Sequence, residues 1–271
     1  MNGIIYYNTG TVCLVRLLVS ICSLRKFYTG PISILSWGDA SHEICDRIAI
    51  ATDSKAIRVD FDMVSCKYPK YMAKTKLQEF TPYENTLYLD SDTLVVGPID
   101  ELFNLIDQHH MLVTSIKRWT TRDVRISKRI NTWAHLYPDL IEDALNFGHV
   151  INCGVYGFRR DASILDEWYK TAAAKEDSIN PDEVSLQLLL PHHKHIVVDN
   201  RFNFITKRGD VNDPDIRILH YQARKHCHIS PNNKWLVAYN EIANHNVADV
   251  VSWQPAGDPK LKKYLKLSHV S

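Results

Sequence analysis

The stretch LYLDSDTLVVGPIDELF, residues 87–103, sets two aspartates at the end of an apolar run. In an extended chain, residues i and i+2 point to the same side, so Asp90 and Asp92 project together while Ser91 faces away. Two adjacent carboxylates repel each other unless a cation lies between them. Carboxylate oxygens suit Mg²⁺ or Mn²⁺, and such an ion can bridge two phosphate groups. The pair therefore indicates a divalent-metal site, with a nucleophile or a strand-ending turn as the alternatives.

The residues around this stretch alternate between strand and helix patterns. Apolar runs bounded by turn residues predict strands at residues 3–7, 32–37, 56–61, 85–90, 150–158, 194–199 and 216–221. Helical spacing of apolar residues predicts helices at residues 11–27, 40–50, 71–80, 161–175 and 181–190. Such alternation predicts an α/β fold with a Rossmann-like, mostly parallel central sheet flanked by helices. Ligands of these sheets bind beyond the carboxyl ends of the strands, which is where the aspartates lie.

Two segments lack such a pattern. Residues 117–133 are polar, basic and aromatic, and we expect a loop that covers the site or binds an acceptor, with a plain solvated loop as the alternative. The chain from residue 229 looks irregular until a short basic helix at 258–267. In the helix expected at 11–27, the cations are expected to face solvent, namely Arg16, Arg25 and Lys26.

The composition is that of an ordinary globular protein. Of the 271 residues 45% are hydrophobic and 23% charged, and 32 basic against 31 acidic residues give a net charge of +1. That balance offers no broad positive field for a nucleic acid. The six cysteines show no paired spacing, which indicates reduced thiols and a cytoplasmic location. Residues 11–27 are too short to span a bilayer, so we expect at most peripheral membrane contact, through residues 258–267.

One interpretation of the aspartate pair is a phosphatase nucleophile. LDSDTLV, residues 89–95, matches the first motif of haloacid-dehalogenase-type phosphatases, in which the leading aspartate, here Asp90, attacks phosphorus. GDVNDPD, residues 209–215, is similar to the later acidic motif of that family. Against this, several elements precede the first motif, which usually closes the first strand. ITKRGD, residues 205–210, also sets two cations where an apolar strand should lead into the acidic motif.

A second resemblance extends in order from about residue 4 to residue 226. The aspartate segment resembles the DxD motif of GT-A glycosyltransferases, most of all the glycogenin-like group of retaining nucleotide-sugar transferases. Further segments resemble the opening strand, turn and helix, the lysine-bearing helix, the N-x-G-V strand, the D-Q helix and the closing histidine segment of that group. They are residues 6–34, 74–92, 151–158, 182–190 and 218–226. The resemblance implies a GT-A (nucleotide-diphospho-sugar transferase) fold.

The resemblance also implies roles for individual residues. Asp90, Asp92 and His220 would hold the metal, and imidazole with two carboxylates suits Mn²⁺ better than Mg²⁺, which stays the alternative ion. Asn152 and Asp182 would be the catalytic pair that binds hydroxyls of the transferred sugar. The other donor-contacting residues would be Tyr7, Asn8, Thr9, Lys74, Ser91, Glu183 and Lys225. The dense histidine cluster HHKH, residues 192–195, has no carboxylate nearby in sequence, and we expect a solvated loop there.

This chain departs from the group at two places. Glu183 stands where the group has glutamine, which adds a charge beside the sugar. In the closing segment Ala223 replaces a glycine, and the lysine comes one position early as Lys225. One of the three residues Arg224, Lys225 and His226 is expected to contact the diphosphate. The donor sugar and the acceptor are therefore expected to differ from those of the best-known relatives.

The function implied is that of a metal-dependent, hexosyltransferase-like enzyme. It would move a sugar from a nucleotide-diphosphate sugar, with a UDP-sugar favoured, to a hydroxyl of a glycan or other acceptor, with retention of configuration. Residues 1–115 would form a nucleotide-sugar-binding half, 116–228 an acceptor-side half of the same domain and 229–271 a tail. Three alternatives stay open: the phosphatase, a nucleotidylyltransferase, and a sugar-nucleotide-binding protein without turnover. Against the nucleotidylyltransferase, no Gly-rich loop with an Arg-Lys pair follows the first strand.

Overall fold

A central sheet of seven strands organises the protein, in the order β3-β2-β1-β4-β7-β6-β8. The computed structural model describes residues 1–61, 67–117, 119–206, 213–221 and 234–243. The strands are β1 (Asn2–Thr9), β2 (Ile32–Trp37), β3 (Lys55–Val59), β4 (Asn85–Leu89), β6 (Met111–Ser115), β7 (Ile151–Arg159) and β8 (Ile196–Val198). Strand β7 runs antiparallel to β4 and β6, and the other pairings in this sheet are parallel. The predicted mostly parallel α/β sheet is confirmed.

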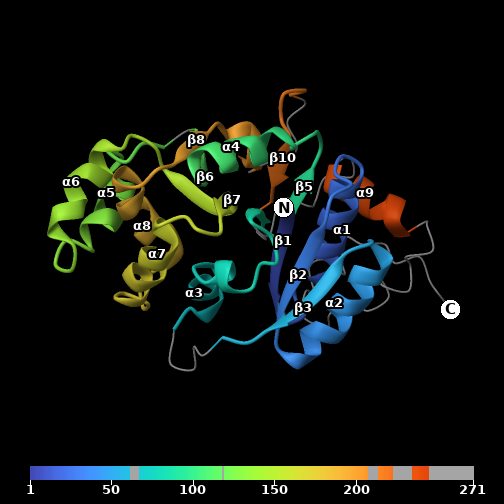
Figure 1. Ribbon diagram of the computed structural model, residues 1–271. Helices are drawn as coiled ribbons and strands as arrows, with labels where there is room; N and C mark the ends of the chain where they lie inside the picture. Colours follow the sequence, from blue (N-terminus) through green and yellow to red (C-terminus); the bar gives the residue numbers. More distant parts are fainter. Residues whose placement is uncertain (62–66, 118, 207–212, 222–233, 244–271) are drawn as a thin grey trace.

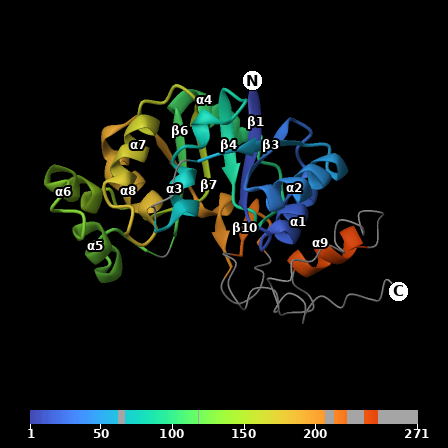
Figure 2. The same ribbon diagram turned by 90° about the horizontal axis from the view of Figure 1, so that it is seen from below.

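Helices cover both faces of this sheet (Figure 1 and Figure 2). One face packs against α1 (Leu14–Arg25), α2 (Asp39–Ala51) and α4 (Glu101–His109), and α9 (Lys234–Ala243) packs on α1. The other packs against α3 (Pro69–Lys74), α7 (Ile164–Ala173) and α8 (Pro181–Leu189). Side chains of β1 alternate between the two cores, with Tyr6 in the first and Tyr7 in the second. Burial on both faces explains why this strand is a continuous apolar run.

A second, three-stranded sheet joins distant parts of the chain. It has the order β5-β10-β9, formed by β5 (Thr93–Val95), β10 (Ile218–His220) and β9 (Phe204–Ile205). Strand β10 lies beside β5 (Figure 1); it runs antiparallel to β5 and parallel to β9. Because β5 begins directly after the aspartate pair, this small sheet brings the end of β10 to the carboxyl end of β4.

The loop predicted at residues 117–133 is wrong for its second half. Helix α5 (Val124–Asn131) lies there, and α6 (Pro138–Asn146), which the sequence did not indicate, follows it. Ile126, Ile130 and Trp133 are buried in a third core, which also takes side chains from α6 and α8. Figure 1 shows α5 and α6 in green at one edge of the molecule, beyond α7 and α8. The apolar spacing i, i+4, i+7 was present but was masked by the exposed basic residues around it.

Two helix predictions also need correction. Helix α9 lies within the tail expected to be irregular, and it buries Trp235, Tyr239 and Ile242 at helical spacing. The single helix expected at 71–80 is α3 followed by a separate 3₁₀ turn, Leu77–Glu79. The Thr75 hydroxyl donates to the Met72 carbonyl at 2.7 Å, which satisfies a carbonyl at the end of α3. The remaining 3₁₀ turns are Leu190–His192 and Asn200–Phe202.

Some predictions concern parts of the chain beyond this fold. The basic helix expected at 258–267 lies outside the described residues, as does most of GDVNDPD. The division near residue 115 stays a prediction, while the central sheet takes strands from both sides of it. Among the described helices, none combines the length and the apolar character needed to cross a bilayer.

Candidate functional site

Two aspartates and a histidine meet where β4 ends. Suitable ligand atoms of Asp90, Asp92 and His220 lie within 4.8 Å of one another, and these residues form the one such group of potential metal ligands among the described residues. His220 Nε2 lies 3.2 Å from an Asp92 carboxylate oxygen and 3.7 Å from one of Asp90. The small sheet fixes this approach, because His220 pairs with Thr93 across β10 and β5. The three residues predicted as metal ligands therefore lie together.

The ring of His220 is held with a defined edge toward the aspartates. Its Nδ1 lies 2.8 Å from Asn203 Oδ1, which leaves Nε2 facing the carboxylates. The ring also packs directly on Gly154 of β7, where a Cβ atom would lie 2.2 Å from its Cε1 and 2.6 Å from its Nδ1. A side chain at position 154 would thus occupy the space of the ring. The donor set, one imidazole nitrogen and two carboxylates, fits a divalent cation.

Charges around the site favour an ionised carboxylate beside a protonated imidazole. Burial alone would raise the pKa of Asp92, but the charge and hydrogen bond of His220, with smaller effects of Arg16 and Lys74, lower that pKa to about 2. Burial would likewise lower the pKa of His220, but Asp92 and then Asp90 raise it above its ordinary value. A metal ion bound by the ring would take the place of the proton on Nε2.

Lys74, predicted to contact the donor, lies beside the first aspartate. Its ammonium group donates to Asp90 Oδ1 at 2.7 Å, and the Tyr88 hydroxyl donates to the same oxygen at 2.5 Å. Burial opposes the charge of Lys74, but Asp90 and then Asp182 raise its pKa above the ordinary value. The competing residue, Lys76, pairs with Glu79 at 3.4 Å instead. The structure thus distinguishes the two lysines and places Lys74 at the aspartate pair.

Asn152 and Glu183, both predicted site residues, are joined by a hydrogen bond. Asn152 Nδ2 donates to Glu183 Oε1 at 2.8 Å. The other oxygen of Glu183 accepts from Arg129 of α5 at 2.8 Å and from Asn180 at 3.0 Å. Burial would raise the pKa of Glu183, but the charge and hydrogen bond of Arg129 lower it. The charge that Glu183 adds to the site is therefore balanced by Arg129, and both of its oxygens already accept hydrogen bonds.

Asp182 differs from its neighbour in having an unsatisfied oxygen. The residue is 2% exposed, and its Oδ1 accepts no hydrogen bond from the described residues. Burial raises its pKa to about 7; Lys74 opposes this shift, and Glu183 adds to it. A buried acceptor without a partner is costly, so a ligand hydroxyl at this position would satisfy it.

The remaining predicted donor residues are distributed as follows. Tyr7 and Asn8 are buried at the end of β1, whereas Thr9 is exposed, and the Asn8 amide donates to the Gly10 carbonyl at 2.9 Å. Ser91 is buried between the two aspartates. The cations predicted to meet the diphosphate lie outside the described residues, namely Arg224, Lys225 and His226. The roles of all these residues in binding stay predictions.

Three side chains at the site were not singled out from the sequence. Arg16 was expected to face solvent but is 5% exposed, and its charge lowers the pKa of Asp92. Helix α1 is apolar nearly all round, a pattern that signals complete burial and could have corrected this prediction. The segments that carry Arg129 and Asn203 are not apolar all round, so no pattern of complete burial marks these two residues.

The histidine cluster at 192–195 is not part of this site. His192 lies 3.3 Å from a carboxylate oxygen of Asp143, and His193 lies 3.3 Å from one of Glu167. These carboxylates are distant in sequence and belong to two different helices, α6 and α7, so each histidine has its own partner. Within the described part of the chain, the cluster forms no group suited to a metal ion.

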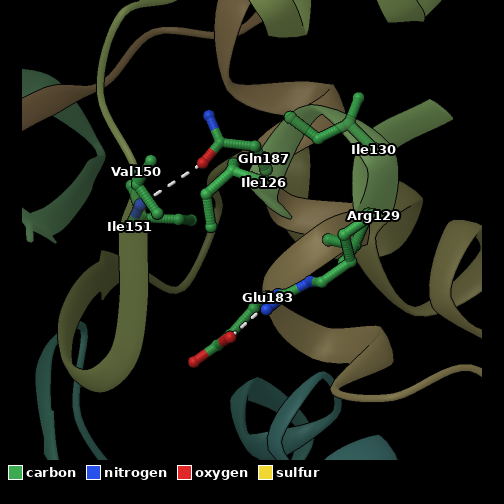
Figure 3. Close-up of a pocket in the computed structure, with 8 residues that line it drawn as sticks. Ile126, Arg129, Ile130, Val150, Ile151, Glu183 and Gln187 are labelled. Carbon is green, nitrogen blue, oxygen red and sulfur yellow. Dashed lines mark hydrogen bonds and ion pairs between the residues drawn. The ribbon is translucent and has the colours of Figure 1, made fainter. Parts of the chain in front are cut away.

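Two cavities adjoin the network around Asn152. A small one, about 10 Å³, lies between α5, α8 and the start of β7; Figure 3 shows the Arg129–Glu183 pair and the hydrogen bond from the Ile151 N–H to Gln187 among its lining residues. A larger one, about 200 Å³, is lined by Ile116, Lys117, Asn200, Asn203, Phe204 and Ile205. The larger cavity reaches Asn203, the residue that contacts His220.

Comparisons with known proteins agree with this fold. The model of the Rhodobacterales glycosyltransferase domain family matches residues 41–193. The bifunctional glycosyltransferase WbbM is 11% identical, with 93% of this chain and 51% of WbbM covered and a TM-score of 0.64. The galactosyltransferase LgtC, in complex with donor and acceptor sugar analogues, is 15% identical, with 92% and 99% covered and a TM-score of 0.58. Mouse xyloside xylosyltransferase 1 is 13% identical, with 82% and 98% covered and a TM-score of 0.57. Among curated protein sequences, none matches this chain.

The family match covers more than half of the chain and includes Asp90, Asp92, Asn152 and Asp182, while His220 lies beyond it. It favours sugar transfer over the phosphatase interpretation, and the structural similarities show the GT-A fold. The glycogenin-like group stays a prediction. The chain is a glycosyltransferase that belongs to the Rhodobacterales glycosyltransferase domain family.

Proposed function

We propose that this glycosyltransferase uses Mn²⁺ to transfer a sugar from a nucleotide-diphosphate sugar, with a UDP-sugar as the favoured donor, to a hydroxyl of a glycan or other acceptor. The observation that carries the proposal is the group formed by Asp90, Asp92 and His220. Its mixed oxygen and nitrogen donors suit Mn²⁺ better than Mg²⁺. The ion, when bound, would neutralise negative charge on the departing diphosphate.

Residues of the chain would bind and orient the donor. Lys74, a partly buried cation beside Asp90, would supply positive charge near the same phosphates. Asp182 Oδ1 can accept a hydrogen bond from a sugar hydroxyl, since no described residue donates to it. Asn152 is fixed by its hydrogen bond to Glu183 and lies at the start of β7, beside the end of β4. We propose retention of configuration, in keeping with the group that the sequence resembles.

The acceptor would enter from the side of the larger cavity. This space of about 200 Å³ is large enough for part of a sugar and lies next to Asn203, hence close to His220. Its rim carries Lys117, an exposed cation, while Phe204 and Ile205 provide apolar surface. A sugar ring offers both apolar faces and hydroxyl edges, so such a lining suits it.

A panel of UDP-, GDP- and dTDP-sugars tests this proposal. We expect one UDP-sugar to raise the melting temperature in the presence of Mn²⁺ but not with EDTA, and to be hydrolysed slowly when no acceptor is present. Thermal shift and nucleotide release are the two measurements. His220→Ala is the matched variant and should lose the Mn²⁺-dependent part of both signals.

The outcomes separate the candidate functions. No metal-dependent response to any nucleotide sugar would contradict the transferase proposal. Binding without hydrolysis or transfer to any acceptor would favour a sugar-nucleotide-binding protein without turnover. A response to GDP- or dTDP-sugars alone would correct the donor base and leave the reaction class unchanged.

The affinity for Mn²⁺ should depend on pH through His220. The metal-free ring carries a proton with a pKa above the ordinary value of 6.5, and the ion must displace that proton. At pH values below the pKa of His220, the affinity for Mn²⁺ should therefore rise by up to about tenfold per pH unit. Above that pKa it should level off. Titrations of Mn²⁺ followed by electron paramagnetic resonance at several pH values measure this. His220→Ala should bind more weakly with a flatter profile; a flat profile in the unaltered protein would contradict the linkage.

A further inference from the structure

We infer that Asn203 is a positioning residue that keeps His220 ready to bind a metal through Nε2; this inference rests on the proposed function. Asn203 is 3% exposed and follows the 3₁₀ turn at Asn200–Phe202. Its Oδ1 lies 2.8 Å from His220 Nδ1. Its Nδ2 donates to Thr114 Oγ1 at 2.8 Å and to Asn152 Oδ1 at 3.0 Å. These two acceptors fix the carboxamide with its oxygen toward His220.

The orientation matters because a neutral imidazole has a single N–H. Two acceptors compete for this proton in the metal-free protein: Asn203 Oδ1 at the Nδ1 edge and Asp92 Oδ1 at the Nε2 edge. Metal binding requires a free lone pair on Nε2, so the proton must reside on Nδ1. Asn203 offers the acceptor that makes this tautomer favourable. Without it, the neutral ring would donate from Nε2 to Asp92 and block its own coordinating atom.

The same carboxamide also connects the metal ligand to the proposed sugar site. The Oδ1 of Asn152 accepts from Asn203, and its Nδ2 donates to Glu183, which in turn accepts from Arg129. The side-chain amides of Asn203 and Asn152 therefore each have one orientation, which their hydrogen-bond partners set. Asn203 thus fixes a ligand of the ion on one side and a residue proposed to contact the donor sugar on the other.

The test uses two substitutions and a control. Asn203→Leu removes both the acceptor and the donors, whereas Asn203→Asp keeps an oxygen for His220 Nδ1, removes the donors and adds a negative charge. The control, Asn85→Leu, also removes a buried asparagine with side-chain hydrogen bonds, to Asn2 and Asp107 at the opposite end of β4. We expect Asn203→Leu to weaken Mn²⁺ binding by about 10- to 100-fold, the usual loss when the partner of a metal-bound histidine is removed. Asn203→Asp should recover most of that loss, and Asn85→Leu should bind as the unaltered protein does.

Nitrogen-15 spectroscopy of the His220 ring adds a measurement that a purely structural role would not affect. In the metal-free, unaltered protein, in alkaline buffer where the ring is neutral, the proton should reside on Nδ1; in Asn203→Leu it should shift to Nε2. A proton on Nε2 in the unaltered protein would overturn the inference even if Asn203→Leu does not fold.

The affinities distinguish this inference from the proposed function. Suppose that the unaltered protein binds Mn²⁺. If Asn203→Leu then bound it equally well, or if Asn203→Asp recovered none of the loss, the role of Asn203 would be overturned and the proposed function would stand. No binding of Mn²⁺ by the unaltered protein would overturn both.

Discussion

Asp92→Asn should abolish the Mn²⁺-dependent response to a sugar nucleotide and weaken Mn²⁺ binding by more than about 100-fold, because a direct ligand should contribute more than the 10- to 100-fold of a residue that only orients one. The substitution keeps the shape of the side chain but removes the negative charge that lies 3.2 Å from His220 Nε2. Asp92 is 9% exposed, so water cannot replace that charge effectively. Metal-free protein should also show a lower pKa for His220, since Asp92 is the main cause of its rise.

Titration of Mn²⁺ by electron paramagnetic resonance measures the loss, and Asp161→Asn is its control. Asp161 is an exposed aspartate that pairs with Arg159 at the end of β7, so its substitution removes a carboxylate and an ion pair away from the site. We expect unchanged Mn²⁺ affinity in that variant. Retention of the original affinity in Asp92→Asn would remove Asp92 from the metal site.

Gly154→Ala should likewise lose Mn²⁺ binding, although the added group is a single methyl. A Cβ at this position would lie 2.2 Å from His220 Cε1 and 2.8 Å from Asn152 Oδ1, well inside contact distance. His220 is 2% exposed and held by Asn203, so the ring cannot swing aside without breaking that hydrogen bond. The methyl would displace the metal ligand, and we expect a loss of Mn²⁺ affinity comparable to that of His220→Ala. Overpacking of this kind should also lower the free energy of unfolding by about 1–3 kcal/mol.

Gly157→Ala in the same strand separates these two effects. A Cβ there would lie 2.3 Å from Ile106 Cδ1, the far end of a flexible side chain in α4, and would not touch His220 or Asn152. Both variants should therefore lose stability in chemical denaturation, but only Gly154→Ala should lose Mn²⁺ affinity. If Gly154→Ala and Gly157→Ala both kept the Mn²⁺ affinity of the unaltered protein, the close packing on His220 would not be needed for binding.

Seven strands and the metal group could be predicted because their signals are local or belong to a motif, whereas β5, β6, β9 and α4 were not predicted. The run at 32–37 coincides with β2, and the carboxylates follow β4 as an apolar strand end predicts. Helix α5 was missed because its cations dominate an eight-residue segment in which Ile126 and Ile130 alone mark the buried side. Its residue Arg129 could not be paired with Glu183 from sequence, since that contact depends on how α5 packs against α8.

Gly154 and Asn203 show a second limit of sequence reasoning. The motif N-x-G-V drew attention to Asn152, but the reason for its glycine lies in the ring of His220, which another sheet carries to that point. Asn203 sits in an unremarkable polar turn, and its hydrogen bonds to His220 and Asn152 exist only in the folded arrangement. Steric and hydrogen-bonding roles between distant segments leave no periodic signal in a single sequence.

The contribution of β10 to the metal site has a consequence for how the protein is made. During synthesis the aspartates leave the ribosome before His220, so the ligand set is incomplete until β10 has emerged. In the finished fold Lys74 pairs with Asp90. Metal capture then requires the docking of β10 against β5. Measured on stalled nascent chains of increasing length, Mn²⁺ uptake would therefore report when the enzyme has completed its small sheet.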